Sequence, residues 1–186
     1  GSTMKPITVA AALDAGSIVP TSTYNDTGTI TLDNKTISNF DGKARGVVSM
    51  QEVLSQSLNI GIAHIVQKMG TGVLRDYFER FGITEETGID LPSEASPLVK
   101  NLESPRIVEY VTAGFGQGVA ITPIAMARAL ATLANHGSVP QPHVGVELRY
   151  PGGVTKELGW SPPRAAVSPE SAETVTRMLV TVVDEA

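Results

Sequence analysis

The chain has 186 residues, of which 41% are hydrophobic, so it is long enough to form one domain around a single core. Its net charge of −5 is dispersed along the sequence, which argues against a nucleic-acid-binding protein, because such proteins need a basic patch. The absence of cysteine excludes disulfides, thiolate chemistry and most zinc sites. No apolar run reaches the roughly 20 residues that span a bilayer, and no signal peptide is visible.

The N-terminal part is predicted to form a helix and then a hairpin. The helix covers about residues 2–13, and Pro6 is tolerated there because it falls in the first turn, where its missing N–H costs little. Residues 28–41 alternate between polar and apolar side chains on either side of Asp33 and Asn34. This pattern predicts a short β-hairpin with its turn at these two residues.

The middle of the chain is predicted to be helical. Residues 49–52, Ser-Met-Gln-Glu, form a capping box that opens a helix. An apolar stripe at helical spacing continues over residues 59–70, and residues 73–81 form a further amphipathic helix. Residues 83–104 contain scattered Gly, Pro, Ser and Glu, and we expect them to form a long ordered loop.

The last part is predicted to contain two helices with a hairpin between them. Thr122 is followed by a proline, a combination that opens a helix, and Gly137 ends it. Residues 144–157 alternate around a Pro-Gly-Gly turn and predict the hairpin. Ser168 caps a last helix that is expected to run to Ala186.

Ser2 and Lys5 form a Ser-x-x-Lys motif at the start of the first predicted helix. Three residues make almost one helical turn, so the hydroxyl and the amine project from the same face and can meet. A serine needs an adjacent base to act as a nucleophile, and a lysine base near neutral pH needs its pKa lowered by roughly three units from about 10.4. Burial and the positive end of the helix are the available means. The motif alone also fits a serine-capped helix of no catalytic use, or a remnant of an expression tag.

Two further segments bear on this choice. Ser57 and Asn59, in Ser-Leu-Asn, are two residues apart and do not share a helix face, so they fit either a break between helices that faces a cleft or a solvated helix surface. Residues 114–118, Gly-Phe-Gly-Gln-Gly, allow positive φ angles and a close approach of another backbone, or form a plain loop. The order and spacing of these segments together favour a catalytic site over chance.

Five segments together form a specific combination of motifs: 1–6, 10–13, 88–94, 114–118 and 131–137. Through them the sequence resembles the penicillin-binding proteins, and in particular the class B, monofunctional transpeptidases. The resemblance covers nearly the whole chain and removes the expression-tag interpretation of Ser2, because the residues after it continue the family pattern.

The resemblance implies a role for each residue of the motifs. Ser2 would be acylated by the penultimate D-alanine of a peptidoglycan stem peptide, and its own N–H would be one oxyanion donor. Lys5 would be the general base and Ser57 would relay a proton to the leaving amine. An amine of a second stem peptide would then take the acyl group and form the cross-link. β-Lactams would mimic the D-Ala-D-Ala end and leave a long-lived acyl-serine.

The same resemblance implies the substrate-binding residues and the setting. Asn59 would hydrogen-bond the substrate amide, and Gly116 and Gln117 would line the substrate site. The parent protein is expected to act at the extracytoplasmic face of the bacterial cytoplasmic membrane, held by an anchor outside this chain. No cofactor is expected, and the three histidines show no metal-ligand spacing with carboxylates.

The Lys-Thr-Gly motif of the family is absent from the sequence, since Lys68-Met69-Gly70 lies inside a helical stripe. We therefore expect residues 1–186 to be a partial transpeptidase domain, from the Ser-x-x-Lys helix to just before the Lys-Thr-Gly strand. The expected fold class is α+β: the mostly helical part of the penicillin-binding protein and β-lactamase-like fold, with short β-hairpins and most of the central antiparallel sheet missing. Alone, the chain is expected to show no transpeptidation and weak or no penicillin acylation. A complementary chain that carries Lys-Thr-Gly would be a partner.

Two other functions stay open at this stage. A β-lactam hydrolase or sensor shares Ser-x-x-Lys, but a hydrolase needs a group that positions the deacylating water. Glu85, Glu86 and Glu94 lie after the second motif, and none lies in a pattern that marks such a group. A scaffold or interaction module without catalysis is the second alternative.

Overall fold

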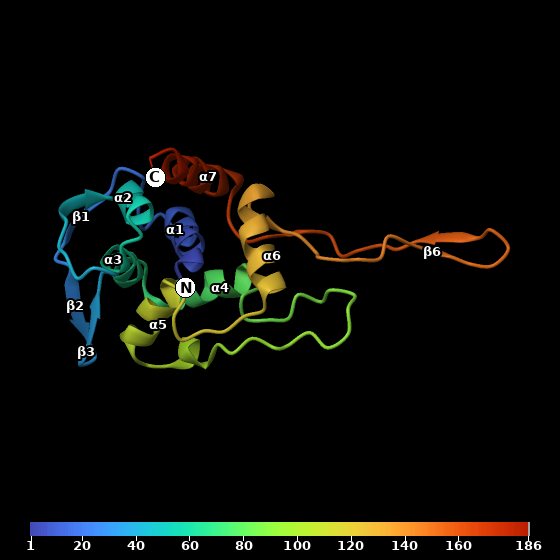
Figure 1. Ribbon diagram of the computed structural model, residues 1–186, viewed down its shortest axis with the longest axis horizontal. Coiled ribbons are helices and arrows are strands. Elements are labelled where there is room, and N and C mark those ends of the chain that lie inside the picture. The colour runs from blue at the N-terminus through green and yellow to red at the C-terminus, as the bar shows by residue number, and fades with distance from the viewer. Residues whose placement is uncertain (186) are drawn as a thin grey trace.

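Helix α1 (Lys5–Asp14) lies in the middle of a body of helices in the computed structural model, which describes residues 1–185 (Figure 1). Its residues from Ile7 to Ala12 are completely buried. Three consecutive alanines present only methyl groups, so α3, α4 and α7 can pack closely around α1. The predicted first helix is therefore the core helix of the chain.

The first turn of this predicted helix is a 3-10 turn, η1 (Ser2–Met4), and α1 begins only at Lys5. Pro6 falls at the start of α1, where it removes no hydrogen bond of the helix. In a 3-10 turn the side chains at positions i and i+3 lie directly above one another. This geometry stacks Ser2 over Lys5.

The other helices follow the predicted signals in most cases. Ser49 forms both hydrogen bonds of the predicted capping box, and Thr122 and Ser168 cap their helices with their side chains. The predicted end of the last helix at Ala186 lies outside the described residues. The helices are α2 (Met50–Ser55), α3 (Asn59–Met69), α4 (Thr71–Arg80), α5 (Ile107–Gly114), α6 (Pro123–Ala134) and α7 (Pro169–Asp184).

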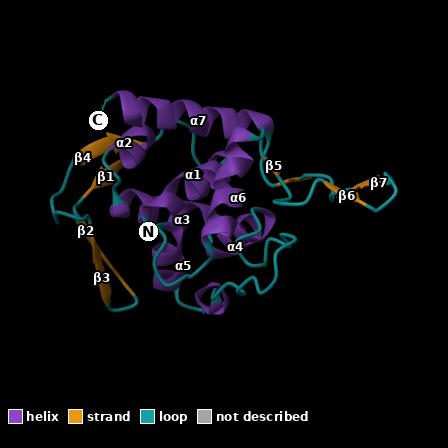
Figure 2. Cartoon of the chain, turned by 45° about the vertical axis from the view of Figure 1, so that its right-hand side comes forward, coloured by secondary structure: helices purple, strands orange, loops and turns teal. Residues whose placement is uncertain are grey.

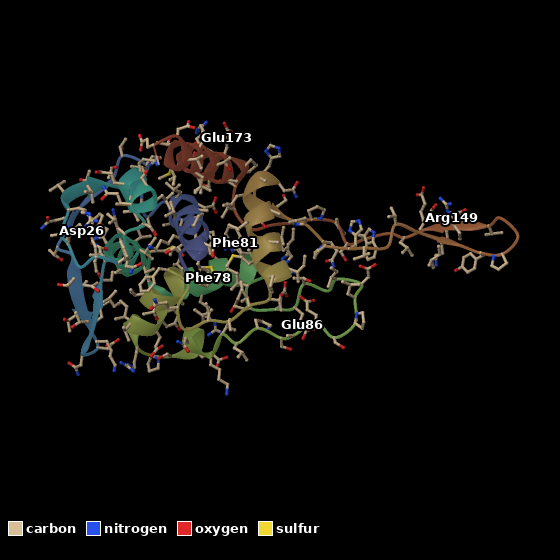
Figure 3. The ribbon with its side chains drawn as sticks, viewed as in Figure 1. Asp26, Phe78, Phe81, Glu86, Arg149 and Glu173 are labelled. Carbon is tan, nitrogen blue, oxygen red and sulfur yellow. The ribbon has the colours of Figure 1, made fainter. Side chains whose placement is uncertain are left out.

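Aromatic side chains fill the core on the α4 side. Phe78 of α4 and Phe81, which follows α4, are both completely buried (Figure 3). None of the helices among residues 1–185 is long and apolar enough to cross a bilayer.

The strands lie at the margins of the helical body and form only two-stranded antiparallel pairs within the described residues (Figure 2). The expected α+β class, mostly helical with short hairpins, is confirmed. The pairs are β1 (Thr23–Asp26) with β4 (Gly46–Ser49), β2 (Thr29–Leu32) with β3 (Lys35–Ser38), β5 (Ser138–Val139) with β8 (Arg164–Ala165), and β6 (Glu147–Arg149) with β7 (Thr155–Glu157).

Both predicted hairpins are present. The turn of the first falls at Asp33 and Asn34, which have φ angles of 47° and 62° as a tight hairpin turn requires. The second hairpin forms an arm that projects far from the helices (Figure 1). Several apolar side chains of this arm are exposed; these are Val144, Val146, Leu148, Tyr150 and Val154.

Four features of the fold were not predicted. Helix α5 begins without a side-chain cap, and its apolar residues pack against α3. The β1–β4 pair joins segments about 20 residues apart, and η2 (Lys100–Glu103) is a short 3-10 turn inside the predicted 83–104 loop. The β5–β8 pair closes the base of the projecting arm.

Candidate active site

A chain of hydrogen bonds joins Ser2, Ser57 and Lys5. The Lys5 ammonium donates to the Ser57 hydroxyl at 3.0 Å and to the Ser57 carbonyl oxygen at 2.5 Å. The Ser57 hydroxyl donates in turn to the Ser2 hydroxyl at 3.1 Å. The structure thus brings these three predicted residues together, although they lie up to 55 positions apart in the sequence.

Lys5 lies almost completely inside the protein, with 2% of its surface exposed, whereas Ser2 and Ser57 face solvent. Burial lowers the pKa of the Lys5 amine from 10.5 to about 8. A neutral amine is therefore accessible near neutral pH, as a general base requires. The sequence-based expectation also invoked the field of the helix terminus, but burial is the cause that the structure supports.

Ser57 stands at a break between two helices. Helix α2 ends at Ser55 and α3 begins at Asn59, and between them Ser57 adopts a left-handed φ of 51°. A serine rarely takes this conformation, which here turns the carbonyl and the hydroxyl of the same residue toward Lys5. The predicted break at Ser-Leu-Asn is confirmed.

Asn59 and Gln117 lie beside this trio rather than within it. The Asn59 amide donates to the carbonyl oxygen of Ser38 at 2.9 Å, and Gln117 is exposed just after α5. Both line a groove of about 490 Å³ between the β2–β3 hairpin and α5. Within residues 1–185 neither side chain hydrogen-bonds to Ser2, Lys5 or Ser57.

Gly116 acts through its backbone. Its φ is 82°, and a Cβ atom added there would lie 2.1 Å from the carbonyl oxygen of Gly1. Only glycine permits this approach, which sets the loop after α5 directly against the residue that precedes Ser2. The glycine-rich segment therefore contacts the N-terminal turn through its backbone, and this is the close approach that its glycines allow.

Phe40 is a groove residue that the sequence did not single out. It follows β3, is 97% exposed and lines the same groove as Asn59. It falls at the end of the predicted 28–41 hairpin, and that position gave no sign of a neighbouring site. An aromatic side chain among polar neighbours was the only available signal.

The three glutamates weighed for a hydrolase are engaged elsewhere. Glu85 forms an ion pair with Arg164, and Glu86 accepts a hydrogen bond from Ser96. The Glu94 carboxylate accepts from the backbone N–H of Thr87 and Gly88. In the part of the chain that the structure describes, the contacts of all three carboxylates hold the segment that follows α4.

Comparisons with known sequences agree with this geometry. A family model described as the transpeptidase domain of penicillin binding proteins matches residues 1–186. The chain is 32% identical to stage V sporulation protein D of Bacillus subtilis over 190 residues, which is 100% of this chain and 29% of that protein. It is 33% identical to the peptidoglycan D,D-transpeptidase PbpA of Mycolicibacterium smegmatis, over 97% of this chain and 38% of that protein. The chain thus spans well under half the length of these relatives.

Solved structures agree in fold. Penicillin binding protein 3 from Mycobacterium tuberculosis, complexed with aztreonam, superimposes with a TM-score of 0.91 at 26% identity, over 98% of this chain and 41% of that one. The D,D-transpeptidase domain of a peptidoglycan glycosyltransferase from Eggerthella lenta gives a TM-score of 0.86 at 25% identity, over 99% of this chain and 48% of that one.

Proposed function

Because the chain belongs to the family of penicillin-binding protein transpeptidase domains, we propose that it supplies the nucleophile and the base of a peptidoglycan D,D-transpeptidase. The observation that carries the proposal is the hydrogen-bonded path from the exposed Ser2 hydroxyl through Ser57 to a buried lysine. A buried amine with a lowered pKa, joined to a serine at a helix start, is the arrangement that serine activation needs.

The reaction begins when the Ser2 oxygen attacks the carbonyl of the penultimate D-alanine. The neutral Lys5 amine takes the hydroxyl proton through Ser57, so the contact in which Lys5 now donates to Ser57 runs in reverse. The oxyanion accepts from the Ser2 N–H, which has no acceptor within its own helix because it lies in the first turn. The bond to the terminal D-alanine then breaks, and the leaving amine receives the proton along the same path.

The second half forms the cross-link. An amine of another stem peptide attacks the acyl-Ser2 ester, gives up its proton to Lys5 by way of Ser57, and releases the Ser2 oxygen, which regains a proton. A β-lactam acylates Ser2 in the same way, but its leaving amine stays tethered. This part of the proposal is supported by the related penicillin binding protein 3, whose structures hold aztreonam and ampicillin.

Substrate contacts and setting follow from the same family. Asn59 and Gln117 are proposed to bind the stem-peptide amides along the groove, and Gly116 to keep the loop in place. The protein would work at the extracytoplasmic face of the bacterial cytoplasmic membrane. A segment with Lys-Thr-Gly, from the same gene or a complementary chain, would complete the site by binding the carboxylate of the substrate.

Intact mass after incubation with benzylpenicillin tests the proposal. We expect one penicilloyl adduct on the peptide that contains Ser2, in any longer gene product that contains this chain, and a weak adduct or none in the chain alone. Ser2→Ala removes the adduct, and Lys5→Met slows its formation strongly while the protein stays folded. An adduct on another residue, or full acylation of Ser2→Ala, would refute the assignment.

The lifetime of the adduct separates this function from a hydrolase. A transpeptidase is expected to keep the acyl group when no acceptor amine is present, because the three glutamates considered for a hydrolase bind other groups among residues 1–185. Rapid release of penicilloic acid would favour a hydrolase. Glu85, Glu86 and Glu94 are bound within their own region, which supports the persistent adduct.

A further inference from the structure

Helix α3, which follows the Ser57 break, begins without a cap of its own. The residue before it is Leu58, whose side chain cannot accept a hydrogen bond, and no local side chain caps the helix. The free N–H groups of a first turn need acceptors when they are buried. Here the N–H of Ile60, which is 4% exposed, donates to the side-chain oxygen of Asn39 at 3.1 Å. A residue from the end of β3 therefore caps α3.

The orientation of the Asn39 amide is fixed by a buried carboxylate. Asp26 is 1% exposed, and the Asn39 NH₂ group donates to its two oxygens at 2.9 and 3.0 Å. The Tyr24 hydroxyl and the Gly28 N–H also donate to this carboxylate, at 2.6 and 2.8 Å. An ionised carboxylate can only accept, so Asn39 must turn its NH₂ toward Asp26 and its oxygen toward Ile60.

The charge state of Asp26 agrees with this role. Burial acts to raise the pKa of the Asp26 carboxyl, but the hydrogen bonds from Tyr24 and Asn39 outweigh it, so the pKa lies below its usual value. The carboxylate is ionised at neutral pH.

Two neighbouring contacts press the same turn of α3 onto the strands. The Asn59 amide holds the Ser38 carbonyl oxygen, one residue before Asn39. A Cβ atom added at Gly61 would lie 2.9 Å from the Tyr24 hydroxyl, so the helix approaches β1 as closely as a glycine permits. The start of α3 is thus held by the strands, while Ser57 stands just before it in a left-handed conformation.

We propose that Asn39, oriented by Asp26, is a positioning residue that holds the start of α3 and thereby keeps Ser57 against Lys5. Neither side chain touches the reacting atoms. The catalytic meaning of this position rests on the proposed function of Ser57, but the mechanical coupling from Asn39 to Lys5 does not.

Nuclear magnetic resonance on the 186-residue chain tests the coupling without requiring activity. Asn39→Ala removes the cap, so Ser57 loosens, water reaches Lys5 and the pKa of Lys5 rises from about 8 toward 10.5. Hydrogen exchange at the Ile60 amide accelerates by about five- to tenfold, the effect of one lost hydrogen bond. Thr31→Ala, on the exposed face of the same hairpin, is the control and leaves both values unchanged. Asp26→Asn keeps the side-chain volume and serves as a second variant with the same expected direction.

The exchanged pair Asp26→Asn with Asn39→Asp is the rescue. It places the carboxylate at position 39, where one oxygen can accept from Ile60 and the other from the new amide at position 26. We expect both readouts to return toward those of the wild type. A folded Asn39→Ala or Asp26→Asn variant with an unchanged Lys5 pKa and an unchanged Ile60 exchange rate would overturn the inference.

Benzylpenicillin acylation separates the two proposals. In a longer gene product that acylates, Asn39→Ala slows acylation and the exchanged pair restores it, whereas Thr31→Ala has no effect. If a longer gene product that contains this chain and a Lys-Thr-Gly segment does not acylate, the proposed function fails. The Lys5 pKa and the Ile60 exchange rate, measured on the 186-residue chain, still test the coupling.

Discussion

The buried amine of Lys5 makes the stability of the chain depend on pH. The pKa of this lysine is 10.5 in the unfolded chain and about 8 in the folded one, so between these values the unfolded state binds more protons. The free energy of unfolding therefore rises with pH through this window. Below about pH 8 both states are protonated, and the cost of burying the ammonium is present in full.

The magnitude follows from the size of the shift. At about 1.4 kcal/mol per pKa unit, the whole change corresponds to about 3 kcal/mol, of which about 2 is regained between about pH 7 and pH 9.5. The ammonium bonds to Ser57, whose hydroxyl meets solvent, so screening reduces the expected gain to about 1 kcal/mol.

Urea denaturation of the wild type and of Lys5→Met, each at about pH 7 and about pH 9.5, measures this gain in the free energy of unfolding. Methionine keeps the length of the side chain and removes the charge, so only the wild type should gain about 1 kcal/mol. Burial raises the pKa of Tyr77 to about 12, with help from Asp14, which opposes the gain above about pH 10 equally in both proteins. Parallel stability curves would show that the ammonium is not desolvated.

Three further substitutions test the packing. Gly116→Ala should cost at least about 1 kcal/mol more than Gly152→Ala, because both have positive φ but only the first meets another backbone; equal losses of melting temperature would contradict this. Phe78→Ala should cost about 3 to 5 kcal/mol in urea denaturation, since the ring is completely buried; a loss below about 1 kcal/mol would place it outside the core. Ser49→Ala removes the capping box and should cost about 1 kcal/mol, whereas an unchanged midpoint would show that α2 does not depend on its cap.

The predictable part of the fold was the part that local signals determine. The helices capped by Ser49, Thr122 and Ser168 carry their start signals in the sequence, and their predicted starts are confirmed. Helix α5 has no cap, and its Ile-Val-Glu-Tyr-Val run suits a strand equally well, so packing against α3 decides its form. The pairing of β1 with β4 is non-local and has no turn signal.

The candidate site divides in the same way. The proximity of Ser2 and Lys5 could be predicted, because three residues make almost one helical turn. The break at Ser57 could be predicted, because Ser57 and Asn59 are two residues apart and do not share a helix face. The Ser57 carbonyl acceptor could not be predicted, because every residue carries a main-chain oxygen. The buried Asp26–Asn39 pair could not be predicted either, because an asparagine after a strand usually indicates a turn. The catalytic and substrate roles of the site residues stay predictions.

The contact of Lys5 with a peptide oxygen has a consequence for mutagenesis at position 57. Substituting alanine deletes the hydroxyl and leaves the amide carbonyl, so the ammonium retains the shorter of its two acceptors. An alanine scan therefore underestimates what this position does for the amine. Replacing the amide that follows residue 57 with an ester, by semisynthesis, would make that carbonyl oxygen a weaker hydrogen-bond acceptor. It would thereby measure the part of the Lys5 contact that the alanine substitution leaves in place.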